Sequence, residues 1–402
     1  MPSIPEINLE DYYYELPENR IAEYPLDERD NSKLLVINRN NDNVSERVFS
    51  DLPDIINENF HIVFNNTKVI PARFYLQRPN DKIVEIFCLN PEYPSPDPQI
   101  SLVSKSSVTW NCLIRGKRIK VGETLTNPFP NITSIQAKIL SKAETFSITF
   151  EWTENLSFYE VLTELGSIPL PPYIKREIEE SDKERYQTIF AKYDGSVAAP
   201  TAALHFTNET IEKLKSKEIN SSELILHVGA GTFKPLTSNK IEEHTMHQEF
   251  FSISKSTIVE LKNAIENNKK ILAVGTTSVR TLESIFIFAE KLINEYNDKC
   301  FINQWEVYEQ NEESKLKLIN EIIKYMDKNH LDTLSGETQL IIIPGYKFRF
   351  VDAMITNFHQ PKSTLILLVA AFMGKELWQK SYHFALENNF RFLSYGDSSI
   401  IL

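Results

Sequence analysis

The sequence has few cysteines and no long hydrophobic run. Its 402 residues include only three cysteines, Cys88, Cys112 and Cys300, which are widely spaced and form no CxxC pair. This pattern excludes a disulfide framework and a cysteine-based zinc site, and it is typical of a reducing cytoplasm. No apolar run reaches membrane-spanning length, so no membrane segment is expected. Because the acidic segment 1–20 lacks a hydrophobic signal core, we expect a cytoplasmic rather than an exported protein.

Motifs for phosphate hydrolysis and metal catalysis are also missing. The chain has no GxxxxGK[ST] segment, which excludes a P-loop nucleotide hydrolase. His244 and His247 are spaced as a ligand pair, but the HExxH pattern and a neighbouring cysteine are absent. We therefore predict no metal site.

Charge is unevenly distributed along the chain. The net charge of −12 argues against a protein that simply coats nucleic acid. Residues 71–150, however, contain ten lysines and arginines and six acidic residues, a net charge of +4, which leaves −16 for the other residues. A basic module on an acidic body can hold a phosphate backbone locally. The alternative is a soluble β-module whose surface is only mildly basic.

Residues 71–150 also differ from the rest in their element pattern. Short β runs alternate with turns and no helix is predicted there, which indicates a small antiparallel barrel or sandwich. Helix–strand alternation begins only afterwards, so we interpret the region as an insertion into a larger α/β unit. The expected division is a main domain formed by 1–70 and 151–402, interrupted by the β-module at 71–150, with 290–336 as a polar helical embellishment.

The stretch Tyr186–Thr207 is the segment around which we expect the rest of the chain to be organised. From Gly195 it carries only small and apolar side chains until it reaches His205, and Pro200 interrupts any helix through it. Small uncharged side chains suit a backbone pressed against a ligand or against another segment. The alternative is a buried connector.

Two strand-to-glycine turns follow downstream. In LILHVGAGTF, Gly229, Gly231 and Thr232 come directly after an apolar strand, where glycines let backbone N–H groups approach a ligand. This is typical of a nucleotide or S-adenosylmethionine loop, but Lys234 stands where a dinucleotide fingerprint needs its third glycine. A plain tight turn is the alternative.

In AVGTTSVRTLES, Gly275, Thr276 and Thr277 lie between a strand and a helix. Amide and hydroxyl groups at a helix N-terminus bind anions, and Arg280 adds a fixed positive charge. The alternative is a capped helix in which Arg280 pairs locally with Glu283.

Five of the eight histidines lie beside glycine, proline or small-residue turns: His205, His227, His244, His247 and His359. Histidine is the side chain that most readily exchanges protons near neutral pH, although a single imidazole is more often a hydrogen-bonded structural group. Asp352 and Asp397 are the carboxylates that we expect to point inward.

The order of these motifs carries more information than any one of them. The chain contains, in order, NNTKVIPAR, IPLPPY, YQTIFAKYDGSVAAPTAALHFT, LHVGAGTFKP, EEHTMHQE, AVGTTSVRTLES, VDAMITNFHQPKSTLILLVAAF and FRFLSYGD. Together they resemble the S-adenosylmethionine:tRNA ribosyltransferase-isomerase family of the queuosine pathway, from about Tyr14 to Asp397. The resemblance implies an α/β fold in which a barrel-like main domain is interrupted by a small antiparallel β-barrel.

The same resemblance implies a reaction. The ribosyl group of S-adenosylmethionine, a cosubstrate, is transferred and isomerised onto 7-aminomethyl-7-deazaguanine at the wobble position of tRNA, which gives epoxyqueuosine-tRNA, adenine and methionine. A base should remove a proton at the sulfonium-activated C5′ and an acid should assist adenine departure, and imidazoles titrating near pH 7 suit both tasks. We expect a monomer that needs no metal.

Within this set of motifs we assign residues to these tasks as our own interpretation. We expect His205 and His227 to carry the proton transfers, with His359 and Asp352 in reserve. The residues expected to hold the cosubstrate are Gly229, Gly231, Thr232, Gly275, Thr276, Thr277 and Arg280. Those expected to hold RNA are Asn66, Lys68, Arg73, Arg115, Lys117 and Arg118.

One departure from the family pattern concerns Ala203, which stands where members usually show glycine. If that position needs a positive φ, alanine costs about 1 kcal/mol. Two other functions remain open at this point. One is an S-adenosylmethionine-dependent RNA methyltransferase built on VGAGTF, and the other is a non-catalytic RNA-binding protein that uses 71–150.

Overall fold

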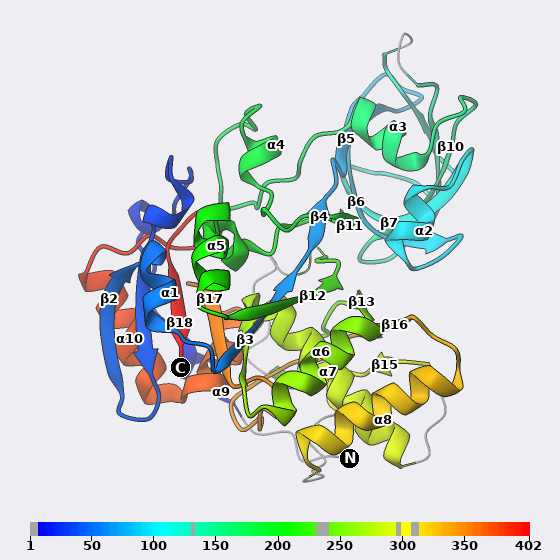
Figure 1. Cartoon of the computed structure of the whole chain (residues 1–402). Coiled ribbons are helices and arrows are strands. Elements are labelled where there is room, and N and C mark those ends of the chain that lie inside the picture. Colours follow the sequence, from blue (N-terminus) through cyan, green and yellow to red (C-terminus); the bar gives the residue numbers. More distant parts are fainter. Residues whose placement is uncertain (1–6, 130–132, 230, 232–240, 295–298, 307–312) are drawn as a thin grey trace.

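The computed structural model describes residues 7–129, 133–229, 231, 241–294, 299–306 and 313–402. Within them the chain forms a mixed α/β main domain and a β-barrel that projects from one end of it (Figure 1). This arrangement confirms the predicted α/β class with an inserted antiparallel barrel. None of the described helices combines the length and the apolar character that crossing a membrane requires.

The main domain is built on one ten-stranded sheet. In spatial order the strands are β15 (Phe301–Ile302), β16 (Thr333–Thr338), β13 (Glu249–Ser254), β12 (Asn220–Leu226), β3 (Phe60–Asn65), β14 (Lys270–Val274), β17 (Ala353–Asn357), β18 (Ser398–Ile401), β1 (Lys33–Asn38) and β2 (Asn43–Val48). The four central strands β12, β3, β14 and β17 are parallel to one another. Their carboxyl ends therefore meet at one edge of the sheet.

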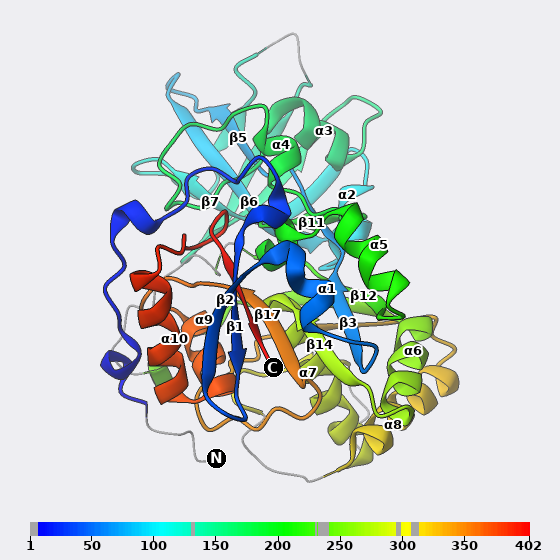
Figure 2. The same cartoon turned by 60° about the vertical axis from the view of Figure 1, so that its left-hand side comes forward.

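Side chains that alternate along the central strands build two cores. Val63, Ala273 and Met354 belong to a core cluster formed with helices α6 to α10. Ile62 and Leu272 belong to another, formed with α1 and α5, which Figure 2 shows beside β3 and β12. Such burial on both faces explains why β3 and β14 are almost continuous apolar runs. The helices are α1 (Leu52–Ile55), α5 (Asn208–Ser216), α6 (Lys255–Glu266), α7 (Gly275–Ile293), α8 (Lys315–Lys328), α9 (Thr364–Met373) and α10 (Lys375–Glu387).

The smaller domain is a closed barrel with the strand order β10-β7-β6-β5-β8-β9. Its strands are β5 (Arg73–Gln77), β6 (Ile83–Tyr93), β7 (Ser107–Arg115), β8 (Thr124–Thr126), β9 (Gln136–Lys142) and β10 (Phe146–Glu151). Trp110 fills the interior and packs on Phe158 of α3 (Phe158–Leu165), with ring centroids 5.5 Å apart. Ser157 and Glu160 start α3 with a capping box.

The chain enters and leaves the insertion at one place, which we call the neck. Arg73 and Ser167 exchange two backbone hydrogen bonds, with N···O distances of 3.3 and 2.8 Å. Next to them, β4 (Thr67–Val69) on the way out pairs in parallel with β11 (Tyr193–Ser196) on the way back. The antiparallel barrel strands thus occupy 73–151, close to the predicted 71–150.

Three local features differ from expectation. A short helix, α2 (Pro98–Leu102), lies within 71–150, where we predicted none, and Asp97 caps it. The helix that the sequence suggests over Lys183–Ala191 is present only as the short helix α4 (Asp182–Arg185). The stretch 290–336 is more than a helical embellishment, because β15 and β16 extend the main sheet.

Ala203 fits its position without strain. It lies in a 3-10 helix, Thr201–His205, and is not among the residues with positive φ. The expected cost of replacing glycine is therefore absent. Thr207 caps α5 by accepting a hydrogen bond from the N–H of Thr210.

Candidate active site

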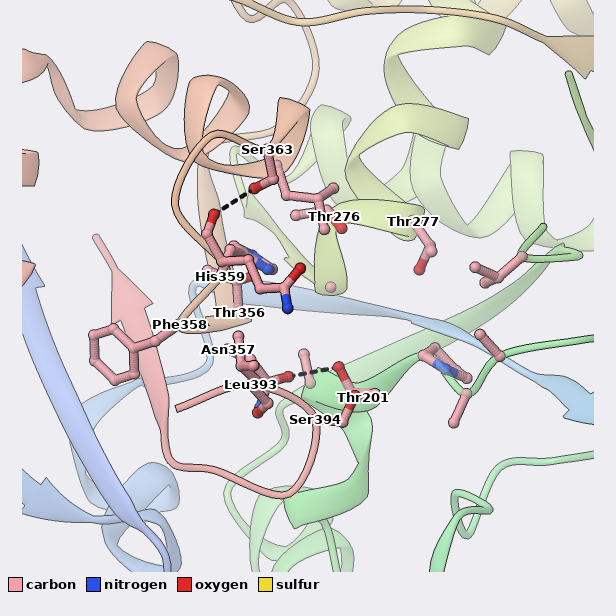
Figure 3. A pocket seen from close by; sticks show the side chains of 18 of the residues that line it. Thr201, Thr276, Thr277, Thr356, Asn357, Phe358, His359, Ser363, Leu393 and Ser394 are labelled. Atoms are coloured by element: carbon pink, nitrogen blue, oxygen red, sulfur yellow. Dashed lines mark hydrogen bonds between the residues drawn. The ribbon is translucent and has the colours of Figure 1, made fainter. Parts of the chain in front are cut away.

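A pocket opens where β12, β14 and β17 end (Figure 3). We call it the strand-end pocket. Its walls come from distant segments of the chain: 198–202, 275–277, 356–360 and 393–394, with Tyr173, Val228, Ser363 and Leu365. Ligands of open α/β sheets bind outside the carboxyl ends of parallel strands, and this pocket has that position. Its cavity volume is about 80 Å³, so a nucleoside-sized ligand would extend beyond its mouth.

The predicted residues Gly275, Thr276 and Thr277 line this pocket. Gly275 begins α7 directly after β14 with φ +87°, a conformation that glycine adopts without strain. A Cβ at this position would lie 3.4 Å from Thr277 Oγ1 and 3.8 Å from the Cβ of Ala202. The buried Thr277 Oγ1 has no hydrogen-bond partner among the described residues. A helix start with such a free hydroxyl can bind an anionic or polar ligand group.

Asn357, at the end of β17, orients the hydroxyl group of Thr201 in the same pocket. Its Nδ2 donates to the carbonyl oxygens of Leu393 and Asp397 at 3.3 and 3.4 Å. These two acceptors fix the orientation of the amide. Its Oδ1 then accepts a hydrogen bond of 2.9 Å from Thr201 Oγ1 (Figure 3).

His205 lies behind Asn357 and does not line the strand-end pocket. Its Nε2 is 3.3 Å from Asn357 Nδ2 and must accept, so Nδ1 carries the proton and donates to Ser32 Oγ at 2.8 Å. Burial, with the charges of Arg391 and Arg29 nearby, lowers the pKa of His205 to about 3. The prediction that this imidazole titrates near pH 7 is therefore wrong. Both ring nitrogens are already occupied within the fold.

His359 is the predicted histidine that the strand-end pocket contains. Its Nε2 lies 2.9 Å from Thr356 Oγ1, and its backbone N–H donates to the hydroxyl of Tyr382 at 3.2 Å. The other ring nitrogen has no hydrogen-bond partner among the described residues. Burial lowers the pKa of His359 to about 4, so the ring is neutral at physiological pH. Neutral imidazole can accept a proton there.

His227 faces a different cavity, between the main domain and the barrel, together with Gly229 and Gly231. Its Nδ1 lies 2.8 Å from Thr67 Oγ1, and burial lowers its pKa to about 3. Gly195 is pressed against this ring, since a Cβ on it would lie 2.7 Å from Cε1 of His227. Thr232 lies outside the described residues.

The segment 195–205 connects these separate places. It starts against His227, passes Gly275 at Ala202 and ends at His205. The structure thus places the two predicted proton-transfer histidines, His205 and His227, outside the strand-end pocket but on its supporting wall. The sequence left two interpretations of this segment open, a backbone beside a ligand and a buried connector. Ala198–Ala202 line a pocket, whereas His205 is buried within the fold.

Arg280, predicted to bind the cosubstrate, is engaged within the protein. It is 5% exposed, its Nη1 donates to Glu249 Oε2, and its Nε donates to the carbonyl of Leu340 at 3.1 Å. Burial by itself raises the pKa of the Glu249 carboxyl, but Arg280 and His247 outweigh it and lower the value to about 2. The buried ion pair leaves Arg280 outside the strand-end pocket, and its predicted partner Glu283 instead accepts from Tyr346.

Asp352 lies at the opposite end of β17 from His359. Its carboxylate accepts from Lys315 Nζ at 2.6 Å and from the backbone N–H of Ile271 at 2.9 Å. Because it sits at the amino end of a parallel strand, it is a full strand length from the pocket. Its contacts are those of a structural group.

The residues predicted to hold RNA divide into two groups. Asn66 is buried and donates to Glu223, Lys68 pairs with Asp194 at 3.2 Å, and the backbone of Arg73 forms the neck. The side chains of Arg115, Lys117 and Arg118 are exposed at the end of β7. Arg78 orders their turn by donating to the carbonyls of residues 117 and 118.

Several pocket residues were not predicted. Thr201 and Tyr173 line the strand-end pocket, and Phe250, Glu249 and Glu337 line the second cavity. Thr201 lies in the central stretch, so its small-residue surroundings were a usable signal. Tyr173 and Glu249 are the last residues of two quoted motifs, IPLPPY and EEHTMHQE, whereas Phe250 and Glu337 have no local motif. Among the described residues, no group of three histidine, cysteine or acidic side chains is arranged to hold a metal ion.

The fold and the pocket define a class: an α/β protein with a ligand site at the carboxyl edge of its parallel strands and an inserted β-barrel beside it. The family model described as "Queuosine biosynthesis protein" matches residues 9–401. The chain belongs to this family.

Named relatives are similar over almost the whole chain. An S-adenosylmethionine:tRNA ribosyltransferase-isomerase of Finegoldia magna is 39% identical, over 98% of this chain and 98% of the relative. One from Aquifex aeolicus is 38% identical, over 98% and 100%. A crystal structure of an S-adenosylmethionine tRNA ribosyltransferase from Thermotoga maritima has 27% sequence identity and a TM-score of 0.48, covering 98% of this chain and 100% of its own.

Proposed function

We propose that this protein is an S-adenosylmethionine:tRNA ribosyltransferase-isomerase. It transfers and isomerises the ribosyl group of S-adenosylmethionine onto 7-aminomethyl-7-deazaguanine at the wobble position of tRNA and releases adenine and methionine. The observation that carries this proposal is the family match over residues 9–401. The strand-end pocket supports it by supplying a site for the cosubstrate.

The strand-end pocket holds the cosubstrate through groups on three strand ends. The first turn of α7, with Gly275, Thr276 and Thr277, offers N–H and hydroxyl donors that suit the methionine carboxylate. Thr201 offers a hydroxyl oxygen that can accept a hydrogen bond from the ribose, and Asn357 holds that hydroxyl in place. Arg280 has no direct role in this arrangement, because it is paired with Glu249.

His359 is the group placed to move a proton. It lines the pocket, its ring is neutral and one ring nitrogen is free of partners among the described residues, so it takes the proton from C5′, next to the sulfonium sulfur, as a base. The imidazolium that forms is then the acid that delivers a proton as adenine leaves. One residue therefore serves both steps in sequence, in place of the two histidines expected from the sequence.

The tRNA is held by the exposed cations of the barrel, chiefly Arg115, Lys117 and Arg118. We further propose that the protein acts in the cytoplasm, where its tRNA substrate is found, as a monomer that needs no metal. These last assignments rest on the composition and on the sequence resemblance.

Product analysis tests the proposal. The protein is incubated with S-adenosylmethionine and tRNA that carries 7-aminomethyl-7-deazaguanine, and small products are separated by chromatography. Adenine with methionine is the expected result. S-adenosylhomocysteine would instead identify a methyltransferase, and tRNA binding without any small product would identify a non-catalytic RNA-binding protein.

A variant separates the role of His359 from that of His205. His359→Ala should lower kcat at least 100-fold with little change in affinity for tRNA, because it removes the group that moves the proton. Matched His205→Ala should chiefly lower stability. Equal turnover of His359→Ala and the wild type would remove His359 from the mechanism.

A further inference from the structure

The cavity that His227 lines lies between the barrel and the main sheet, and we call it the interdomain cavity. It has a volume of about 380 Å³. The barrel contributes Leu89, Pro91 and Asn111 to one wall, and the main domain contributes His227, Phe250 and Glu337 to the other. A cavity of this size lies in the range of small-molecule sites.

The main-domain wall carries two stacked rings with a carboxylate beside them, and we call this group the platform. The backbone N–H of His227 donates to the carbonyl of Phe250 at 3.0 Å, and Phe250 is the direct cross-strand partner of Glu337. Residues opposite one another in antiparallel strands project from the same face of a sheet. The rings of His227 and Phe250 are nearly parallel, at 17°, with centroids 6.2 Å apart.

Two groups on this platform lack partners within the fold. The Nε2 of His227 is buried and forms no hydrogen bond to the described residues, although the side chain is only 5% exposed. Glu337 takes part in no ion pair among the residues that the structure describes. Buried polar groups are almost always satisfied in native proteins, so an unpaired imidazole nitrogen in a cavity wall points to a ligand.

The chemistry of the platform selects a type of ligand. Parallel aromatic faces stack on planar bases, and proteins that read unpaired nucleotides combine such stacking with hydrogen bonds to the Watson–Crick edge. An ionised carboxylate only accepts hydrogen bonds. It therefore suits the N1–H and N2–H₂ donors of a guanine-type base and disfavours adenine, whose N1 is an acceptor.

We propose that the interdomain cavity binds the acceptor base of the RNA, a guanine-type base flipped out of the anticodon loop and stacked on Phe250, with its donor edge toward Glu337. This inference rests on the proposed function, in which such a base is the acceptor. Enzymes that do chemistry on a base take it out of the stack in this way.

The surroundings of the cavity fit this use. Val228 lines the strand-end pocket and the next residue, Gly229, lines the interdomain cavity, so the two ligands lie on either side of one short backbone segment. On the barrel, Asn111 and Arg115 belong to the same strand and are separated by about 13 Å at 3.3 Å per residue. The exposed cations at the end of β7 are therefore within reach of phosphates near a base held at Asn111.

Binding measurements with a modified RNA test this assignment without relying on turnover. Two anticodon stem–loops are compared, one with the guanine-type base at the wobble position and one abasic there. Wild-type protein should bind the abasic RNA about tenfold more weakly, because stacking and the carboxylate hydrogen bonds are lost. In Phe250→Leu and in the isosteric Glu337→Gln, this difference should fall below about threefold.

Matched controls and a second RNA sharpen the result. Phe146→Leu in the barrel and Glu212→Gln on α5 should keep the tenfold difference, since neither lines the cavity. Glu337→Gln should also bind a stem–loop with adenine at the wobble position better than the wild type does, because an amide can donate to N1.

The outcomes separate the two proposals. If wild-type protein releases adenine but the difference between the two RNAs is absent, or persists in both cavity variants, the base-binding assignment is overturned and the proposed function stands. If the wild type releases no adenine from S-adenosylmethionine with substrate tRNA, the proposed function fails whatever the cavity binds.

Discussion

At the scale of single residues, the buried pair of Arg280 and Glu249 shows how position changes the role of a charge. Removing one partner of such a pair leaves an unpaired charge in the interior and costs about 3–5 kcal/mol. Arg280→Leu should therefore lower the free energy of unfolding by this amount in urea titration, with the KM for S-adenosylmethionine changed less than threefold. The double variant Arg280→Leu/Glu249→Leu should recover part of the loss. A stable Arg280→Leu protein with a tenfold higher KM would instead make Arg280 a cosubstrate ligand, as the sequence predicted.

Residue roles were predictable from the sequence where a local pattern determines them. Gly275 and the two threonines after it stand between an apolar strand and a helix, and they do line the strand-end pocket. His205 was not predictable, because its protonation depends on Ser32 and Asn357, which are more than 150 residues away in opposite directions. No sequence signal shows that Glu249 forms an ion pair with Arg280.

At the scale of elements, the junction between β14 and α7 controls the shape of the pocket. Gly275→Ala should raise the KM for S-adenosylmethionine about tenfold and lower stability by about 1–2 kcal/mol, because a Cβ at φ +87° is strained and points at Thr277 and Ala202. Gly374→Ala is the matched control, since Gly374 has φ +86° with no atom within 4 Å of its Cβ position. It should lose similar stability with an unchanged KM. Equal KM values for the two variants would contradict the assignment of the pocket.

The element pattern was readable in outline. Short β runs with turns at 71–150 indicated the inserted barrel, and the strands β5 to β10 are there. The two-residue strand β15 was not predictable, because Phe301–Ile302 carries no periodicity of its own and pairs only when β16 lies beside it. The ten-stranded sheet likewise depends on long-range pairing that no local pattern encodes.

At the scale of the whole molecule, the buried histidines make stability depend on pH. Burial lowers the pKa values of four histidines from 6.5 in an unfolded chain: to about 4 for His61 and His359, and to about 3 for His205 and His227. Between pH 6.5 and 4 the unfolded chain binds protons that the folded protein does not, so the free energy of unfolding falls as pH falls. Each histidine contributes about 1.4 kcal/mol per pH unit.

Urea titrations at pH 7, 6 and 5 measure this dependence. His61→Gln should reduce the slope between pH 6 and 5 by about 1.4 kcal/mol per unit, since one of the four groups is gone. The same slope in the variant and the wild type would mean that His61 is protonated in the folded protein.

Binding of tRNA should depend on the barrel cations and on salt. Replacing Arg115, Lys117 and Arg118 by alanine should weaken binding and reduce the slope of log Kd against log salt by about 2–3, at roughly 0.7–0.9 for each lost phosphate contact. The matched control replaces three exposed lysines of the main domain, Lys213, Lys215 and Lys328, and should leave the slope unchanged. An unaltered slope in the barrel variant would exclude this surface from the tRNA interface.

The neck, where Arg73 and Ser167 exchange backbone hydrogen bonds, has a consequence for how such a protein is assembled. A segment whose two ends already touch adds almost no constraint to the chain that hosts it, so a whole module can be exchanged there while the sheet keeps its strand order. Grafting a short glycine-containing turn from Ala72 to Ile168 should leave a shortened chain that still folds and keeps its strand-end pocket, yet has no wall against which to hold an RNA base. Substrate choice and scaffold are, in this architecture, separable parts.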